Sequence, residues 1–420
     1  MLDEGLPISE QSRIPVDNGC VAAQDGRESP PNLPLRAGHN HQPVRGEQPT
    51  GVIVGPDARD WYQKGQLVTA DIRISIPTEW ERRGLAIGRA QTDTGESVAG
   101  DPCIVWDEEV KGWRMFLFYA PPGHAHALCP DPLARGPWSV AGPLSFANPD
   151  AMLGGHTHKP YVVMDAHHPN RPARIGGQCS LVTVSHLEGH KVIQQAWAER
   201  LCGPWTLVDA PLIGLGAHNE FDAKHADAVT GFFFPERNEI LYFYMGYPEV
   251  PQPRRVSPLG SAQGGAIQRV GELQAQKLGI VLPPSEVPGH WAGGWVGGLQ
   301  LLPGRQHRWV GLLNASPTAP VASDTAAHRE EPPPSLGGFA FCDEEFPIKG
   351  WEWCPEPIEW IKDIPEAAIA AGEGVNLWRH HLLAIRDQHL ALFYNSGPYG
   401  REQLYERRAA LSWPACVGGP

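Results

Sequence analysis

A tryptophan–proline unit recurs along this chain and constrains its fold more than any other feature. In each copy a short extended stretch follows the Trp, and Pro plus an aliphatic residue come five or six positions after it. The copies are GPWSVAGPLSF from Gly136, GPWTLVDAPLI from Gly203 and GWEWCPEPIEW from Gly350. Recurrence on this scale is typical of repeat proteins, in which each repeat is one supersecondary unit. We therefore expect the chain to be built from copies of one structural unit.

The composition indicates that the unit consists of strands. The 420 residues include 47 Gly and 43 Pro, which favour turns between short strands over long helices. With 15 Trp and 41% hydrophobic residues, the chain can fill a large core. Only residues 364–371 (IPEAAIAA) show a helical pattern.

Short apolar runs come in pairs, as the strands of hairpins do. The pairs are 101–106 with 113–120, 159–164 with 179–185, 227–234 with 240–247, 298–302 with 308–315, and 375–385 with 389–396. A third run often follows, and the Trp-Pro unit makes the fourth. The pattern predicts an all-β fold, a five-bladed β-propeller of four-stranded antiparallel blades, with a strand near 65–76 closing the ring. A large β-sandwich or two β-domains in tandem is the alternative.

Residues 1–50 lack a periodic apolar pattern and are expected to form a flexible leader, with 51–420 as a single propeller domain. The N-terminus has no secretory signal pattern, no run approaches the ~20 apolar residues of a membrane span, and the eight Cys form no CxxC pair. We therefore expect a cytoplasmic protein without a membrane partner. The formal charge of −13 argues against a nucleic-acid partner. The oligomeric state stays open.

Several segments resemble the five-bladed β-propeller glycoside hydrolases, a group that includes families 43, 32, 62, 117 and 130. Ala99–Pro102 (AGDP) opens the first blade, GPW closes blades, and Phe221–Ala223 (FDA) precedes the third blade. The strand ILYFYMGY (240–247) and the segment LFYNSGPYGREQLY (392–405) are also similar to that group. The resemblance implies cleavage of a glycosidic bond in a carbohydrate substrate. It requires no cofactor, although some of these enzymes hold a central calcium ion.

Glycoside hydrolysis uses two carboxyl groups whose separation sets the stereochemical outcome, and we expect inversion. In a propeller, the first residues of the innermost strands converge on an axial funnel. Asp101 lies where the resembled family 43 enzymes carry their general base, although Asp before Pro is also an ordinary turn residue. Asp227 is expected at the corresponding place of the third blade, and the resemblance makes it the orienting carboxylate. Glu220 and Asp222 compete for a role as an active-site carboxylate.

The general acid is missing from the place that the resemblance to families 43 and 32 implies for it, the start of the fourth blade. The start of the fourth blade, HWAGGWVGGLQ (290–300), holds no carboxylate. Glu373, at the mouth of the fifth blade, is one candidate for the acid. A histidine is another, for which the resemblance to family 117 offers a precedent.

Polar and aromatic residues at the blade entrances are expected to bind the sugar. The candidates are Asp222, His156, His158, Lys159, His225, Trp295, Trp378 and Arg379. The His residues have an ordinary alternative as hydrogen-bonded structural residues, and the Trp residues as core. Lys159 and Arg379 would serve an anionic sugar or neutralise buried carboxylates. No metal-ligand set is expected, because His-x-His spacing supplies only two ligands.

The leading hypothesis is thus a glycosidase of the family 43 type. A propeller that binds glycan without turnover is one alternative, supported by the missing acid. A phosphorolytic enzyme like family 130 would need a basic phosphate pocket. A metal-dependent lactonase or lyase would use axial His and Asp ligands.

Overall fold

The computed structural model describes most of the chain beyond its first seventy residues. The described residues are 72–90, 97–120, 123–249, 261–317, 335–358, 364–374, 376–385, 389–398 and 400–410. They all belong to a compact unit spanning Gly55–Pro420. The expected leader, 1–50, lies outside the described residues.

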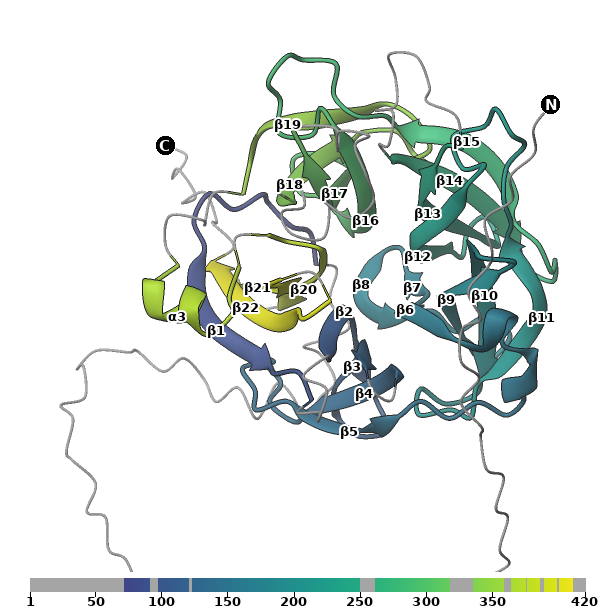
Figure 1. Ribbon diagram of the computed structural model, residues 1–420, viewed down its shortest axis with the longest axis horizontal. Helices are drawn as coiled ribbons and strands as arrows, with labels where there is room; N and C mark the ends of the chain where they lie inside the picture. Colours follow the sequence, from purple (N-terminus) through teal and green to yellow (C-terminus); the bar gives the residue numbers. More distant parts are fainter. Residues whose placement is uncertain are drawn as a thin grey trace, which may run out of the picture. The chain divides into compact units, whose positions relative to one another are not determined.

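Five four-stranded antiparallel sheets form the blades of a propeller (Figure 1). Blade 1 comprises β2 (Val98–Asp107), β3 (Gly112–Ala120), β4 (Gly123–Cys129) and β5 (Ser139–Pro143). Blade 2 comprises β6 (Thr157–Val162), β9 (Cys179–Leu187), β10 (His190–Ala198) and β11 (Thr206–Ile213). Blade 3 comprises β12 (His225–Phe234), β13 (Glu239–Tyr247), β14 (Ala262–Arg269) and β15 (Gln276–Leu282). Blade 4 comprises β16 (Trp295–Pro303), β17 (Trp309–Ser316), β18 (Leu336–Cys342) and β19 (Trp351–Pro357).

Blade 5 combines the two ends of the propeller. It comprises β20 (Arg379–Ile385), β21 (His389–Ser396), β22 (Gln403–Ala410) and β1 (Glu81–Ile87). Short helices lie in connections: η1 (Pro149–Ala151), η2 (Leu153–Gly155) and α3 (Glu366–Ala370). The predicted all-β, five-bladed propeller is confirmed, and the strand pairs lie where the apolar runs placed them.

The strand that closes the ring is β1 and not the predicted strand at 65–76, of which only residues 72–76 are described. β1 pairs antiparallel with β22, whereas Ile74 forms only an isolated parallel bridge with Gly304 in blade 4. As the outer strand of its blade, β1 mixes exposed and buried positions and carries the charged pair Arg82 and Arg83. Its low apolar content hides it from a search for apolar runs.

The Trp of each Trp-Pro unit packs against the preceding blade. Each indole meets a Phe of the second strand of the preceding blade nearly edge to face. The pairs are Trp138–Phe393 at 5.4 Å, Trp205–Phe116 at 6.0 Å and Trp351–Phe243 at 6.1 Å between ring centroids. Edge-to-face geometry is preferred by aromatic pairs because of the ring quadrupole. The recurrence in the sequence therefore reflects a repeated contact between blades.

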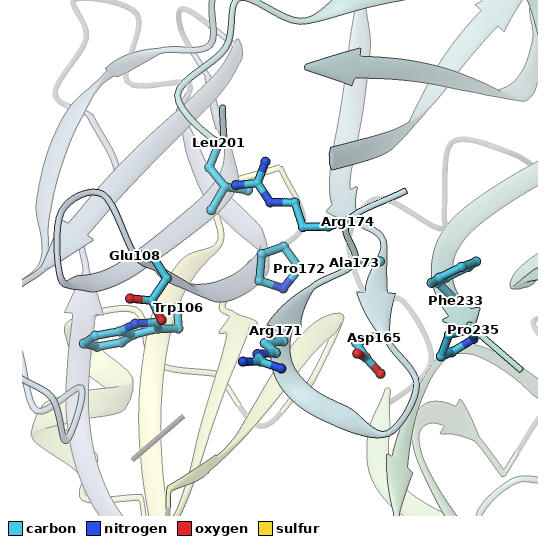
Figure 2. A pocket seen from close by; sticks show the side chains of 10 residues that line it. All are labelled: Trp106, Glu108, Asp165, Arg171, Pro172, Ala173, Arg174, Leu201, Phe233 and Pro235. Atoms are coloured by element: carbon cyan, nitrogen blue, oxygen red, sulfur yellow. The ribbon is translucent and has the colours of Figure 1, made fainter. Parts of the chain in front are cut away.

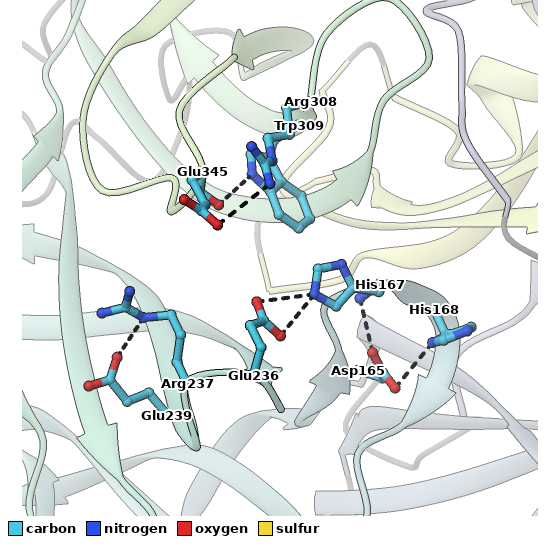
Figure 3. A network of polar contacts seen from close by, with 9 residues as sticks. All are labelled: Asp165, His167, His168, Glu236, Arg237, Glu239, Arg308, Trp309 and Glu345. Atoms are coloured by element: carbon cyan, nitrogen blue, oxygen red, sulfur yellow. Dashed lines mark hydrogen bonds and ion pairs between the residues drawn. The ribbon is translucent and has the colours of Figure 1, made fainter.

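A hairpin between the first two strands of blade 2 crosses to other blades near the centre of the ring (Figure 1). Its strands are β7 (Met164–Asp165) and β8 (His168–Pro172), and β7 pairs in parallel with β12 of blade 3. Asn170 is buried and exchanges two hydrogen bonds with the backbone of Ala384 in blade 5. Asp165 accepts from the backbone N–H of His167 and pairs with His168, which holds the turn (Figure 3). The hairpin thus ties blades 2, 3 and 5 together.

Candidate active site

Four of the five innermost strands carry the same irregularity near their start. In β2, β6, β12 and β16, one extra residue stands opposite the second strand of the blade. The first bulge residue has a φ between 50° and 67° and is Asp101, Lys159, Ala228 or Gly298. This left-handed conformation is costly for residues other than Gly, and bulges of this kind redirect side chains next to active sites. The repeat of the fold therefore places Asp101 and Lys159 at equivalent positions of blades 1 and 2.

Asp227 does not share that position. It precedes Ala228, so it stands one residue before the place that corresponds to Asp101. The prediction that Asp227 occupies the corresponding place in blade 3 is corrected by one residue. The reason is that the register of the bulge cannot be read from the apolar pattern of the strand.

The Asp101 carboxyl is buried beside a guanidinium group. Its Oδ1 lies 3.9 Å from Nε of Arg379, the first residue of β20. Burial raises the pKa of Asp101, while the positive charges of Lys159 and Arg379 oppose the rise. A carboxylate with a raised pKa is a better proton acceptor than an ordinary surface aspartate.

Asp227 is held by two ammonium groups. Lys159 Nζ lies 2.7 Å from Oδ1 and Lys191 Nζ lies 2.7 Å from Oδ2. The backbone N–H of Ala228 also donates to Oδ1 at 2.7 Å. Burial by itself raises the pKa of Asp227, but the two lysines outweigh it and hold the pKa well below its ordinary value. Asp227 is therefore ionised at neutral pH and does not donate a proton.

Arg379 links blade 5 to blade 3 and fills the space in front of blade 4. Its Nη1 donates to the backbone oxygen of Ala228 at 3.1 Å. A side chain at either glycine of blade 4 would clash with these neighbours. A Cβ at Gly298 would lie 2.7 Å from that Nη1, and a Cβ at Gly297 would lie 1.9 Å from the side chain of Met245. The start of blade 4 therefore has no room for a carboxylate side chain, which explains the Gly-Gly pair found there.

Glu402 is a candidate that the sequence reasoning missed. It immediately precedes β22, is 6% exposed, and its backbone oxygen accepts from the N–H of Ala99 at 3.0 Å. This contact sets Glu402 against β2, two residues from Asp101. Burial raises the pKa of Glu402, and the negative charge of Asp101 adds to the rise. Nothing in the local pattern GREQLY marks this residue, because its neighbour in space is far away in the sequence.

The remaining candidate carboxylates make their contacts elsewhere. Glu373 is buried in an ion pair with Arg82 of β1, the outer strand of blade 5. Asp222 accepts from the hydroxyl of Tyr244 at 2.8 Å and pairs with Lys277. Glu220 is exposed, and its Oε2 accepts from the backbone N–H of Ala217 at 2.8 Å. These bonds hold blades and loops, and none of them reaches Asp101.

The candidate histidines adjoin the lysines of blade 2. The rings of His156 and His158 lie 4.3 Å and 5.4 Å from the ring of His186. His225 Nδ1 accepts from the backbone N–H of Lys191 at 3.1 Å. Burial, with Lys191 next, lowers the pKa of His225 to about 4, and burial with Lys159 lowers that of His158 well below its ordinary value. Both rings are neutral at pH 7.

The two candidate tryptophans differ in their surroundings. Trp295 packs with Met245 and with Ala228, the residue that follows Asp227 in the chain. Trp378 is half-buried, and its indole N–H donates to the backbone oxygen of Gly397 at 3.3 Å. Trp295 therefore belongs to the neighbourhood of the axial charges, and Trp378 to the loop of blade 5.

We call Asp101, Lys159, Lys191, Asp227, Arg379 and Glu402 the axial group. They come from β2, β6, β10, β12, β20 and the residue preceding β22, and thus from blades 1, 2, 3 and 5.

Solved structures with a similar fold include glycoside hydrolases. One glycoside hydrolase has a TM-score of 0.57 at 11% identity, covering 87% of this chain and 99% of its own. A thermostable family-43 glycoside hydrolase has a TM-score of 0.52 at 14% identity, covering 77% and 94%. A protein of family 130, mannoside phosphorylases that include glycoside hydrolases targeting β-1,2-mannosidic linkages in Candida mannan, has a TM-score of 0.51 at 10% identity, covering 80% and 97%.

The chain has the five-bladed β-propeller fold of these glycoside hydrolases. The resemblance found in the sequence is confirmed at this level. The sequence itself matches no protein-family model and no curated protein. Identities this low establish a shared fold, and function has to be argued from the site.

The central calcium ion that the resemblance allows stays a prediction. Among the described residues, no three His, Cys, Asp or Glu lie together as a metal site. Calcium takes six to eight oxygen ligands, whereas Asp101 and Asp227 are surrounded by Lys and Arg. Among the same residues, no helix has the length and apolar character needed to span a membrane.

A pocket of about 380 Å³ lies apart from the axial group (Figure 2). It is lined by Trp106, Glu108, Asp165, Arg171, Pro172, Ala173, Arg174, Leu201, Phe233 and Pro235. Trp106 and Phe233 lie near the ends of β2 and β12, opposite to the ends that carry Asp101 and Asp227. This pocket adjoins the central hairpin and shares no residue with the axial group.

Proposed function

We propose that this protein cleaves a glycosidic bond of a carbohydrate at the axial group, with inversion at the anomeric carbon. One observation carries the proposal: Asp101 is held in a left-handed conformation at a bulge of the innermost strand, buried beside Arg379. Residues kept in costly backbone conformations cluster at functional sites. The propeller fold shared with glycoside hydrolases supports the same reaction class.

In the proposed reaction, ionised Asp101 takes a proton from water as the oxygen attacks the anomeric carbon. Glu402, whose pKa is raised by burial, acts as the acid in this proposal and gives a proton to the departing glycosidic oxygen. The bond between carbon and leaving oxygen breaks as the new carbon–oxygen bond forms, so a single displacement inverts the centre. Asp227 stays ionised and positions Lys159 and Lys191.

Substitution of Asp101 by Asn tests the assignment. Asn tolerates the left-handed conformation, so Asp101→Asn is expected to fold as the native protein does. Loss of the base should lower kcat about 10²–10⁴-fold on any glycoside that the native protein cleaves. The exposed Glu220→Gln is the matched control and should keep full activity. Full activity of Asp101→Asn would refute the role, and proton NMR of the first-formed anomer tests inversion.

Phosphorolysis is a second candidate, favoured by the positive charges of Lys159, Lys191 and Arg379. Phosphate would then attack in place of water and yield a sugar 1-phosphate. Product analysis in buffers with and without phosphate separates the two reactions. Tight glycan binding without either product would instead support a binding protein.

A further inference from the structure

The pocket of Figure 2 is a second candidate binding site, away from the axial group. Trp106, which lines it, follows Asp101 on β2 by about 15 Å of extended chain. The volume of about 380 Å³ falls within the range of about 300–1,000 Å³ that is usual for small-molecule sites. The pocket therefore has room for a small ligand that does not touch the axial group.

Hydrogen bonds across blades fix the walls of the pocket. The backbone N–H of Ala166 in the β7–β8 hairpin donates to the backbone oxygen of Phe233 in blade 3 at 3.0 Å. Asn170, which precedes Arg171, exchanges two hydrogen bonds with the backbone of Ala384 in blade 5. A site whose walls are held in this way needs little ordering when a ligand binds.

Arg171 brings a guanidinium group to the wall of the pocket. The residue is half-buried, and its side chain forms no hydrogen bond or ion pair with any of the described residues. Two other arginines nearby in the fold are paired, Arg114 with Asp107 and Arg200 with Glu109, each at 2.7 Å. A ligand with acceptor oxygens would supply hydrogen-bond partners to Arg171.

Two carboxylates supply acceptors in the same pocket. Glu108 is exposed. Asp165 is partly buried, accepts from the backbone N–H of His167 with one oxygen and pairs with His168 through the other. Carboxylate oxygens have two lone pairs each, so both groups can accept further hydrogen bonds. In the view of Figure 2 the guanidinium of Arg171 stands between these carboxylates, so donors and acceptors alternate along the lining.

The rest of the lining is mostly apolar and includes the aromatic ring of Phe233. Phe233 and Pro172 are partly exposed, and Pro235 is exposed. An anion in the pocket would meet two carboxylates, and a cation would meet two guanidinium groups, those of Arg171 and Arg174. An uncharged ligand with hydroxyl groups and an apolar face therefore fits this lining best.

We propose that this pocket binds a short neutral saccharide. Sugar hydroxyls both donate and accept, so they match the guanidinium groups of Arg171 and Arg174 as well as the carboxylates of Glu108 and Asp165. The C–H face of the sugar ring packs against Phe233, as apolar surface does in small-molecule sites. The site goes beyond the proposed function and does not depend on it, because it shares no residue with the axial group.

Titration calorimetry tests the site in the full-length protein and in Asp101→Asn, in which the pocket is unchanged and a bound disaccharide is not consumed. The neutral probes are glucose, galactose, mannose, xylose, arabinose and their disaccharides. Galacturonate, glucosamine and phenylalanine are the anionic, cationic and zwitterionic probes. At least one neutral sugar should bind, and added salt should leave its affinity unchanged, since an uncharged ligand is not screened.

Arg171→Met is the decisive variant, because it removes the donors and keeps the aliphatic stem. The affinity for the neutral sugar should fall about ten-fold or more, whereas Arg171→Lys, which keeps a donor, should lose less. Arg269→Met, at an arginine of β14 that is 73% exposed, is the matched control and should bind as the native protein does. Melting temperatures report whether each variant folds.

Hydrogen exchange in the native protein gives a readout that needs no variant. The bound sugar should slow amide exchange in residues 164–174 and 232–235, which form the walls of the pocket. Slowed exchange only at the starts of the innermost strands would place the sugar at the axial group and overturn the inference.

The remaining outcomes separate the two proposals. Binding of no neutral sugar, an affinity that Arg171→Met leaves unchanged, or a preference for a charged or zwitterionic probe overturns the inference. Cleavage of glycosides without sugar binding in this pocket overturns it as well and supports the proposed function. Sugar binding that depends on Arg171, in a protein that cleaves no glycoside, keeps the inference and refutes the proposed function.

Discussion

Single residues at the axial group owe their chemistry to their partners. Asp101, Asp227 and Glu402 are all buried carboxyls, yet the pKa values of Asp101 and Glu402 are raised while that of Asp227 is held low. The difference arises because only Asp227 receives two ammonium groups. Environments that push the pKa values of neighbouring carboxyls apart are how acid and base roles are divided at neutral pH.

The assignment of Glu402 as proton donor predicts a dependence on the leaving group. Glu402→Gln should lose about 10²–10⁴-fold in kcat on glycosides with alkyl leaving groups, which need protonation. It should lose far less on dinitrophenyl glycosides, whose leaving group departs without a proton. Equal losses on both substrates would contradict the role.

The same assignment predicts a pH dependence. A donor is active below its pKa, so activity should be lost as pH rises through the raised pKa of Glu402. The profile of kcat/KM against pH measures this alkaline limb. The limb should appear on alkyl glycosides and be weak or absent on dinitrophenyl glycosides, whose leaving group needs no proton; a limb that persists in Glu402→Gln belongs to another group.

At the scale of elements, blades are joined by aromatic pairs of one kind. Trp205 is completely buried and meets Phe116 of the preceding blade. The repeat therefore stabilises several contacts between neighbouring blades by the same kind of Trp–Phe pair. Its copies need not contribute any residue to the axial group.

Removing the aromatic side chain from such a contact between blades should destabilise the protein. Trp205→Ala should lower the free energy of unfolding by about 3–5 kcal/mol, the usual cost of deleting a buried aromatic ring. Urea unfolding measures the change, and a double-mutant cycle with Phe116→Ala isolates the pair at about 0.5–1.5 kcal/mol. Leu273→Ala, at a residue that is 70% exposed, is the control. If Trp205→Ala lowers the free energy of unfolding no more than Leu273→Ala does, the Trp205–Phe116 contact does not stabilise the ring.

At the scale of the whole molecule, closure of the ring depends on one strand from the other end of the chain. β1 pairs with β22, and Arg82 on β1 forms an ion pair with buried Glu373. Sequence reasoning placed Glu373 at the funnel, because it stands at the mouth of blade 5. The structure gives it a partner that closes the ring.

This placement predicts that Arg82 serves stability. Arg82→Met leaves the Glu373 carboxylate buried without its charge partner, which should cost about 2 kcal/mol, since the arginine is itself partly exposed. Thermal unfolding measures the loss, and kcat at a temperature well below the transition should stay within about 3-fold of the native value. A large fall in kcat without a loss of stability would return Glu373 to the list of catalytic candidates.

The sequence by itself determined the all-β class, the five blades and most strand positions. It could do so because the inner strands are buried on both faces and appear as continuous apolar runs. In addition, the Trp-Pro unit recurs where one blade packs against the preceding one. It singled out Asp101, Asp227, Lys159 and Arg379. Only the tertiary structure decided that Lys191 and Glu402 join them, that β1 closes the ring and that blade 4 has no room for an acid. Those facts depend on which side chains and backbone bulges meet across blades far apart in the chain, and no local pattern records such meetings.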